Sequence, residues 1–312
     1  MTVPFFSGRD VTAAVSSAEA YDAVREAFVA YARGEWTMPP KVYVTNYPAG
    51  DFRAMPALGG GHALLKWVTS FPGNPARGLP TVTGLVLLSD AEDGRLVAIL
   101  DAAVVTALRT AAAAVVAADT LRRADAASYA VVGCGVNGAE TARMLVARGA
   151  TPLVWDVDEE RRRSVADRLG ARVARSAEEA LACDVVVTVT PGREVLYGLN
   201  SLRAGQHVSL MGADGPGKAE VAVEELRRAS LFCDDWEQAS HGGELAGAVE
   251  RGVVTRSDVT DLGAVLTGDA DGRRDAADIT LFDSTGLAIQ DLAIANAAYS
   301  KADRFDLQRL EL

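Results

Sequence analysis

The chain has 312 residues, 49% of them hydrophobic, and a formal net charge of −11. This length suffices for one large core or two modest cores, and the negative charge makes nucleic acids and anionic membranes poor candidate partners. The N-terminal segment lacks the basic start and the apolar core of a signal peptide. Because no uninterrupted apolar run reaches the roughly 18 residues of a spanning helix, we expect a soluble, cytoplasmic protein without a membrane partner.

The cysteines and histidines do not form a pattern that binds metal. They are widely spaced, without a CxxC motif or a Cys/His cluster: Cys134, Cys183, Cys233, His62, His207 and His241. Such spacing favours neither a disulfide framework nor a zinc site. We expect no metal, and we expect the three cysteines to pack as small apolar side chains.

The first third of the chain predicts a helix lying across a sheet. Residues 16–33 carry apolar side chains at helical spacing, and Ser16 and Glu19 can form a capping box at the start of this helix. Short apolar segments, separated by Gly, Pro and Asp, are predicted strands: 41–47, 52–58, 62–70, 81–90 and 95–100. Consecutive strands joined by short turns indicate an antiparallel or mixed sheet.

A long alanine-rich helix at 101–123 marks a change of pattern, because strands and helices alternate after it. The predicted strands are 129–133, 152–156, 172–174, 184–190, 207–212 and 231–235, and the predicted helices are 138–148, 158–169, 176–182 and 221–229. Alternation with nearly continuous apolar strands is typical of a parallel, doubly wound sheet. A last helix, within 284–302, could pack back on the first domain.

These patterns predict an α/β protein with a Rossmann-type doubly wound sheet and a discontinuous α+β domain. We expect residues 1–120, completed by 286–312, to form the α+β domain, and residues 121–285 to form the Rossmann domain.

The segment "VVGCGVNG" has the glycine spacing of a dinucleotide-binding turn. Gly133, Gly135 and Gly138 follow an apolar strand and open a helix, and Asp156 ends the next strand. In such turns the first glycine permits the tight bend, the second lets the pyrophosphate approach the backbone, and the third allows close helix–strand packing. Backbone N–H groups at the helix start, near Val136 and Asn137, would meet the phosphates. A purely structural glycine turn is the alternative.

The acidic residue favours NAD over NADP. The carboxylate of Asp156 can accept hydrogen bonds from both hydroxyls of the adenosine ribose, and it would repel a 2′-phosphate. The arginines at 161–163 are the feature that could favour NADP instead.

Two cations interrupt apolar patterns in the first domain. Strand alternation places Lys66 on the same face as Leu64 and Val68, where a lysine must be paired, lie at an edge or face a site. From the strand pattern alone, an edge or snorkelling lysine is the usual explanation. Arg109 is the only charged residue between Asp101 and Asp119, and it could clamp a carboxylate or form a structural ion pair.

The segment "HVSLMGADGPGKAE" places Asp214 and Lys218 after a predicted parallel strand. Ligands of open α/β sheets bind at the carboxyl ends of the strands. These two residues are therefore candidates for the site, although a solvated turn would also explain them.

Several ordered stretches together resemble the ornithine cyclodeaminase and mu-crystallin family across nearly the whole chain. They are "AMPA", "KWVTSFPGNPARGLPTVTG", "ALRTAAAA", "VVGCGVNG", "GADGPGKAEV" and "LFDSTGLAIQDLA". The resemblance implies an NAD(P)-binding Rossmann domain, a discontinuous substrate-binding domain through which subunits form a homodimer, and chemistry at the carbon that bears an amino acid's nitrogen.

The same resemblance implies roles for individual residues. Lys66 and Arg109 would hold the substrate carboxylate, and Asp214 would be the acid/base group beside the substrate nitrogen, so that Asp214 and Lys66 are the candidate catalytic residues. Lys218 would orient the turn. The remaining candidates are Met55 for the substrate, and Asn74, Thr81 and Thr190 for the cofactor. Lys41 stands where many members have an arginine, and it keeps the charge without the bidentate fork.

Three functions agree with this pattern. The first is an NAD-dependent oxidoreductase of an α-amino acid or its imine, as in the alanine dehydrogenase and ketimine reductase members. The second is an ornithine or lysine cyclodeaminase, which uses NAD catalytically and releases ammonia. The third is nucleotide binding without turnover, as in a lens mu-crystallin. The chain ends soon after its last helix, without the longer C-terminal extension of the cyclodeaminases, and this favours the first function. No residue forms a dedicated acidic pocket for a distal ammonium, although Glu35, Asp51 and Glu244 are candidates, so the side chain of the substrate stays open.

Overall fold

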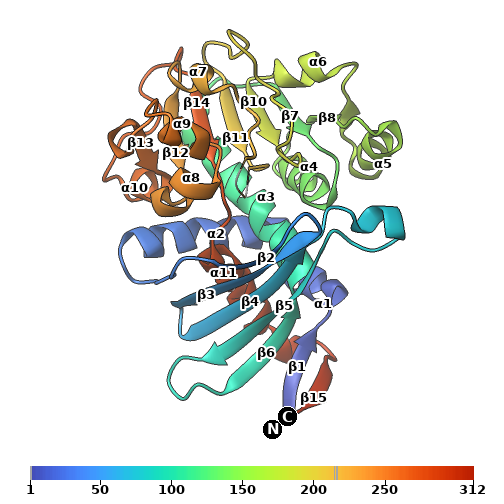
Figure 1. The fold of residues 1–312 in the computed structure, drawn as a ribbon. Helices are drawn as coiled ribbons and strands as arrows, with labels where there is room; N and C mark the ends of the chain where they lie inside the picture. The colour runs from blue at the N-terminus through green and yellow to red at the C-terminus, as the bar shows by residue number, and fades with distance from the viewer. Residues whose placement is uncertain (1, 214, 216) are drawn as a thin grey trace. The chain divides into compact units, whose positions relative to one another are not determined.

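The computed structural model describes residues 2–213, 215 and 217–312. The chain forms two compact units, each drawn in Figure 1. Unit 1 consists of Met1–Arg109 and Leu287–Leu312, and unit 2 consists of Thr110–Gly286. The division therefore falls inside helix α3 (Ala102–Leu121), between Arg109 and Thr110.

Unit 1 is built on a seven-stranded sheet with the order β15-β1-β6-β5-β4-β3-β2. Its strands are β1 (Thr2–Phe6), β2 (Val42–Asn46), β3 (Gly50–Gly59), β4 (His62–Ser70), β5 (Val82–Asp90), β6 (Leu96–Asp101) and β15 (Gln308–Glu311). The pairs from β2 to β6 are antiparallel and β1 pairs parallel to β6, which makes the sheet mixed as predicted. Strands β1 and β15 escaped prediction because they are short and pair with partners distant in sequence.

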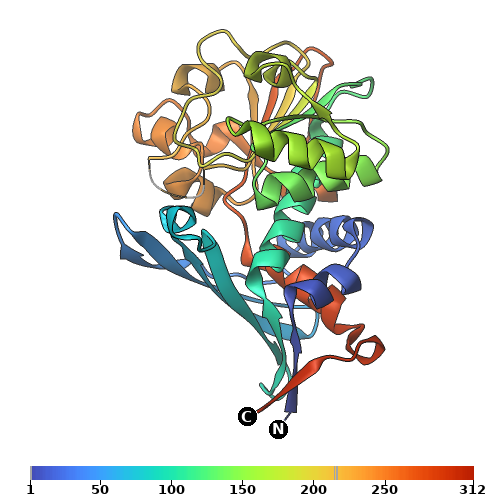
Figure 2. The same ribbon diagram turned by 90° about the vertical axis from the view of Figure 1, so that its right-hand side faces the viewer.

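Helices cover one face of this sheet. They are α1 (Gly8–Ala14), α2 (Ser17–Ala32) and α11 (Ala288–Tyr299). The predicted capping box of α2 is present, since Ser16 Oγ accepts from Glu19 N and Glu19 accepts from Ser16 N. Helix α11 packs against α2, β3 and β4, and Figure 2 shows both long helices on the same side of the strands. The covered face is apolar, with Leu64, Val86 and Leu88 buried, and Lys66 is buried among them.

Unit 2 is built on an eight-stranded parallel sheet with the order β13-β12-β14-β11-β10-β7-β8-β9. Its strands are β7 (Tyr129–Val132), β8 (Leu153–Trp155), β9 (Arg172–Val173), β10 (Val185–Thr188), β11 (His207–Leu210), β12 (Ser230–Cys233), β13 (Val259–Asp261) and β14 (Thr280–Asp283). The Rossmann-type sheet is confirmed.

The helices of unit 2 connect these parallel strands (Figure 1). They are α4 (Val136–Ala147), α5 (Glu159–Leu169), α6 (Ala177–Leu181), α7 (Val223–Leu226), α8 (Trp236–Gly242), α9 (Ala246–Glu250) and α10 (Leu262–Thr267). The predicted helix at 221–229 is thus a single turn, and the segment 236–283, which carried no prediction, adds β13, β14 and three short helices. All three cysteines are free and buried, as predicted.

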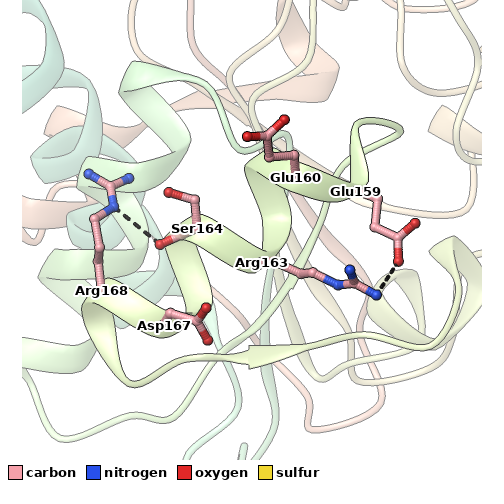
Figure 3. Close-up of a pocket in the computed structure, with 6 residues that line it drawn as sticks. All are labelled: Glu159, Glu160, Arg163, Ser164, Asp167 and Arg168. Carbon is pink, nitrogen blue, oxygen red and sulfur yellow. Dashed lines mark hydrogen bonds and ion pairs between the residues drawn. The ribbon is translucent and has the colours of Figure 1, made fainter.

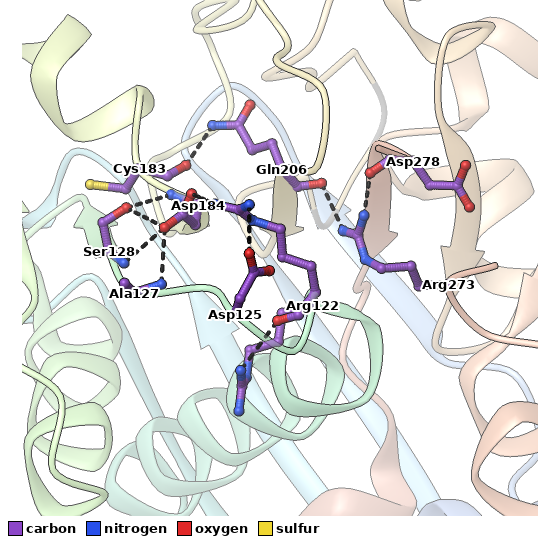
Figure 4. Close-up of polar contacts among 10 residues, drawn as sticks. Arg122, Asp125, Ala127, Ser128, Cys183, Asp184, Gln206, Arg273 and Asp278 are labelled. Carbon is purple, nitrogen blue, oxygen red and sulfur yellow. Dashed lines mark hydrogen bonds and ion pairs between the residues drawn. The ribbon is translucent and has the colours of Figure 1, made fainter. Parts of the chain in front are cut away.

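A polar network joins the amino ends of the central strands of unit 2 (Figure 4). The carboxylate of Asp184 accepts from the backbone N–H groups of Ala127 and Ser128, both at 3.0 Å, and from Arg123 at 2.6 Å. Arg273 donates to the carbonyl oxygen of Gln206 at 3.1 Å. These contacts tie together the starts of β7, β10, β11 and β14, which leaves the carboxyl ends of the strands for a ligand.

Helix α3 is long and apolar enough to cross a membrane by length and composition, yet 72% of its apolar window is buried. Such burial is typical of a core helix.

Candidate active site

The turn between β7 and α4 has the backbone of a phosphate-binding loop. Gly133 has φ +102°, and a Cβ there would lie 2.5 Å from Val189 O. A Cβ on Gly138 would overlap Gly133 O, whereas a Cβ on Gly135 would meet no atom of the described residues within 4 Å. The first and third glycines are therefore required by packing, and the second borders open space. Within the part of the chain that the structure describes, no side chain caps the start of α4, which leaves N–H groups near Val136 and Asn137 for an anion.

A pocket of about 490 Å³ opens beside this turn, within unit 2. It is lined by Val132, Gly133, Gly135, Trp155, Asp156, Val157, Arg161, Val189, Thr190, Pro191, Arg193, Glu194 and Leu196. These residues follow the carboxyl ends of β7, β8 and β10. Strands β7 and β10 are neighbours from which the chain continues in opposite directions, and such a switch point is where open α/β sheets bind ligands.

Asp156 is held in place at the end of β8. Its Oδ2 accepts from Cys134 N at 2.6 Å and its Oδ1 accepts from Asp158 N at 2.9 Å. Each carboxylate oxygen can accept a second hydrogen bond. The carboxylate is therefore fixed without being saturated, as the recognition of two ribose hydroxyls requires.

The three neighbouring arginines differ in their surroundings. Arg161 lines the pocket and pairs with Asp158 at 3.2 Å. Arg162 stacks over Trp155, with its Cζ 4.2 Å from the ring centroid. Arg163 points along α5 to Glu159, at 2.6 Å (Figure 3). Of the three, only Arg161 lines the pocket.

A second hollow, of about 590 Å³, lies on the exposed face of α5 (Figure 3). All of its lining residues come from this helix, and the contacts drawn among them are internal to it: Arg163 pairs with Glu159, and Arg168 donates to Ser164 O at 3.1 Å. Charged side chains that satisfy one another along a single helix form a solvated face, and we assign no site to it.

Thr190, at the edge of the pocket, is bound to a buried carboxylate. Glu220 accepts from Thr190 Oγ1 and Thr188 Oγ1, both at 2.5 Å. The backbone N–H groups of Glu220 and Val221 donate in turn to Glu244, at 2.9 and 2.7 Å. Burial raises the pKa of Glu220, and it raises that of Glu244 to about 8. This network anchors the end of β10 to the segment that follows Lys218, while Asp214 lies outside the described residues.

In unit 1, two cations meet one buried carboxylate. Lys66 Nζ lies 2.9 Å from Asp291 Oδ1, and Arg109 Nε lies 3.4 Å from the same oxygen. The side chains of Lys66, Asp291 and Arg109 are 1%, 0% and 12% exposed. Burial lowers the pKa of Lys66 to about 8, although the negative charge of Asp291 acts in the opposite direction. We name Lys66, Arg109 and Asp291 the carboxylate cluster.

This geometry corrects one expectation and identifies the ion partner of Arg109. The edge or snorkelling position for Lys66 is wrong, because β4 lies between β3 and β5 and the ammonium is fully buried. Arg109 forms an ion pair with Asp291, in agreement with one of the two alternatives left open for it, while Asp101 Oδ1 accepts from Val104 N at 2.9 Å.

The other candidates in unit 1 lie at different places. Met55 is directly opposite Lys66 in the β3–β4 register, and Lys41 precedes β2. Asn74 closes its own loop by donating to Pro80 O at 3.0 Å, and Thr81 O accepts from Phe71 N at 2.8 Å. Asn74 and Thr81 are not among the residues that line the pocket of unit 2, and their assignment to the cofactor stays a prediction.

Asp291 was missed as a candidate from sequence. It is the only charged residue between Asp283 and Lys301, in a helix of small and apolar residues. The same signal singled out Arg109, and it would have singled out Asp291 as well.

The chain is similar to known proteins over nearly its whole length. A sequence model of the ornithine cyclodeaminase/mu-crystallin family matches residues 4–305. An alanine dehydrogenase from Archaeoglobus fulgidus is 44% identical over 301 residues, covering 94% of this chain and 93% of that one. The structure of an archaeal alanine dehydrogenase dimer with bound NAD superposes with a TM-score of 0.94 at 40% identity, covering all of both chains.

A further solved structure is the Δ1-pyrroline-2-carboxylate reductase of Thermococcus litoralis, in complex with NADH and L-proline. It superposes with a TM-score of 0.92 at 26% identity and covers 99% of this chain and 100% of that one.

Proposed function

The chain belongs to the ornithine cyclodeaminase/mu-crystallin family, and we propose that it oxidises alanine, or an α-amino acid with a similarly small neutral side chain, in a reversible NAD-dependent reaction. It is an NAD-dependent oxidoreductase of amino acids or their imines, like the relatives that it matches. The 44% identity to an alanine dehydrogenase supports the choice of alanine among these substrates.

The carboxylate cluster is the observation that carries this proposal. Among the described residues, this cluster holds two cations against one carboxylate on the buried face of unit 1, which gives it a net positive charge. Arg109 Nε is buried and makes no hydrogen bond within the described residues. A cation pair with unused donors is suited to an α-carboxylate, and a carboxylate held at two points fixes the direction of the α-hydrogen.

The turn after β7 fits NAD. Gly135 borders open space where the pyrophosphate would lie, α4 begins without a side-chain cap, and Asp156 would bind the ribose hydroxyls. NAD supplies the hydride acceptor for the oxidation.

The residues of the chain would orient the substrate and move its protons. Lys66 and Arg109 hold the carboxylate, and Asp214 accepts the proton that the amine loses as the α-carbon gives up hydride. The product is the imino acid, which water converts to the 2-oxo acid and ammonia. In the reverse direction the same carboxyl group returns the proton to nitrogen.

The acids considered for a distal ammonium support a neutral side chain in the substrate. Asp51 is bound by Arg53, whose Nε lies 2.6 Å from Asp51 Oδ1. Glu244 is buried in unit 2 and accepts from backbone N–H groups, and Glu35 is exposed. Asp51 and Glu244 are therefore already bound to other groups, and Glu35 lies in solvent, whereas a diamino acid such as ornithine would need a carboxylate available for its distal ammonium.

A substrate panel tests the proposed function. The purified protein is mixed with NAD and single L-amino acids, or with NADH, ammonium and 2-oxo acids, while NADH absorbance and free ammonia are followed together. Alanine should yield NADH and ammonia in equal amounts. Ammonia from ornithine or lysine at constant NADH would identify a cyclodeaminase instead, and NAD binding without turnover of any amino acid would indicate a mu-crystallin-like binding role.

The uncovered face of the unit 1 sheet supports a homodimer. Alternate residues of β2, β4 and β5 present large apolar side chains to solvent: Val42, Val44, Leu65, Trp67 and Leu85, each at least 40% exposed. Phe52 stacks against Trp67 with the ring centroids 5.8 Å apart. A contiguous apolar face of this kind is typical of a subunit interface. We propose that two copies pair through it in the cytoplasm, a reducing compartment in which free cysteines persist.

Replacing Trp67 by Asp should therefore convert the dimer into monomers, because the charge would be buried at the interface without a partner. Sedimentation equilibrium measures the change. Leu199→Asp is the matched control, since Leu199 is 66% exposed but lies in unit 2. A Trp67→Asp protein that remains as dimeric as the control would contradict this interface.

A further inference from the structure

We propose that Asp291 is a positioning residue, which holds the Lys66 ammonium and the Arg109 guanidinium together and keeps Lys66 charged for the substrate carboxylate. This inference rests on the proposed function and adds to it a residue of helix α11. It assigns to the C-terminal segment of unit 1 a direct influence on the pH range in which substrate binds.

The position of Asp291 in the fold suits a negatively charged side chain. The residue lies in the first turn of α11, where the helix dipole stabilises an anion. Its side chain is fully buried, and α11 packs over β3 and β4. Because water cannot reach it, the carboxylate depends on the two cations for its stability, and they depend on it.

The contacts leave both cations able to take a second carboxylate. Lys66 and Arg109 share one oxygen of Asp291, Oδ1. The other oxygen, Oδ2, has no hydrogen-bond partner within the described residues. Lys66 donates one hydrogen bond to Asp291 and has three N–H donors in all. A single shared oxygen therefore sets the distance between the two cations without using up their donors.

The charge on Lys66 depends on a balance among its neighbours. Asp291 from α11 favours the charged form, whereas burial, Arg109 from α3 and Arg53 from β3 disfavour it, and Arg53 is itself bound to Asp51. The result is a lysine whose pKa is lowered to about 8. Without the charge of Asp291, the pKa of Lys66 would fall further, and the substrate carboxylate would meet a charged Lys66 less often.

The test compares Asp291→Asn with the wild type across pH 6 to 9, using NAD and alanine. We expect KM for alanine to rise at least about fivefold at pH 8, because a fall of one unit from a pKa of about 8 lowers the protonated fraction of Lys66 from about one half to about one eleventh. The increase should shrink toward pH 6, where Lys66 regains its proton, while kcat at saturation changes little. The ratio of variant to wild type cancels the ionisation of alanine itself. Asp303→Asn, which removes an exposed charge from unit 1, should leave KM unchanged at every pH.

A second readout does not depend on turnover. Protein labelled with carbon-13 at lysine Cε reports the titration of each lysine by NMR, and Lys66→Met identifies the Lys66 signal. In Asp291→Asn this signal should titrate at lower pH than in the wild type. Asp291→Glu, which keeps the charge, should restore the wild-type titration of Lys66 and most of the affinity for alanine. If the Asn variant does not fold, the Glu variant still tests whether a carboxylate at this position sets the titration of Lys66.

The kinetic and NMR measurements distinguish a failure of the proposed function from a failure of the role proposed for Asp291. A wild type that does not act on alanine would overturn the proposed function, while the NMR titration would still test Asp291. Equal increases in KM at all pH values, or an unchanged Lys66 signal, would show that Asp291 only supports the fold. An Asp291→Glu protein whose Lys66 titrates as in the Asn variant would likewise refute the inference.

Discussion

Replacing Lys66 by Met should lower kcat/KM for alanine by about two to three orders of magnitude. The substrate carboxylate would lose one partner of a buried, hydrogen-bonded charge pair, a change that costs about 2–5 kcal/mol. Met fills a similar volume without a charge, so the packing between β3, β5 and α11 should be largely kept. Steady-state kinetics measure the loss, and titration with NAD should show unchanged cofactor affinity, since the pocket beside Gly133 and Asp156 lies in unit 2.

The Lys66 variant also needs a control for stability, because it leaves Asp291 with Arg109 alone. Lys301→Met removes another lysine of unit 1, one that pairs with Glu19 outside the carboxylate cluster. It should cost some stability and no catalytic efficiency. If Lys66→Met kept kcat/KM within a few-fold of this control, Lys66 would have no part in binding the substrate carboxylate.

Replacing Asp214 by Asn should lower kcat by about 10² to 10⁴, the usual contribution of a positioned acid or base. Asn has nearly the same size as Asp but cannot accept the proton that the substrate amine gives up. NAD binding, measured by fluorescence titration, should not change. This role rests on the resemblance of the "GADGPGK" segment to the family, since Asp214 lies outside the described residues.

Lys218→Met, in the same segment, provides the comparison for Asp214→Asn. Because Lys218 is expected only to orient the segment, its replacement should lower kcat less than replacement of the proton acceptor Asp214. The two variants should bind NAD equally well. A kcat near the wild-type level in Asp214→Asn would refute the acid/base role of Asp214. A larger loss of kcat in Lys218→Met than in Asp214→Asn would indicate that Lys218 is the acid/base group and Asp214 the orienting residue.

Local patterns explain why much of the fold could be predicted. The capping box at Ser16 and Glu19 spans four residues, and the glycine turn with Asp156 lies within a single strand–helix–strand unit. The capping box and the glycine turn both depend on the backbone conformation of a short stretch of chain. The residue types in that stretch restrict this conformation, so the sequence alone can predict it. Strands β1, β13, β14 and β15 lie outside the consecutive strands at 41–100 and the strand–helix alternation at 129–235, so no pattern of neighbouring elements marked them.

The sequence by itself determined the Rossmann-type unit and NAD as the cofactor, predicted a ribose-binding role for Asp156, and singled out Lys66 and Arg109 as unusual charges in apolar surroundings. Only the tertiary structure decided which group those charges contact. Strand alternation is the same at the edge and in the middle of a sheet, so it could not place Lys66 in a central strand. The carboxylate that Lys66 contacts is 225 residues away in the chain, and such an ion pair depends on distance in space alone.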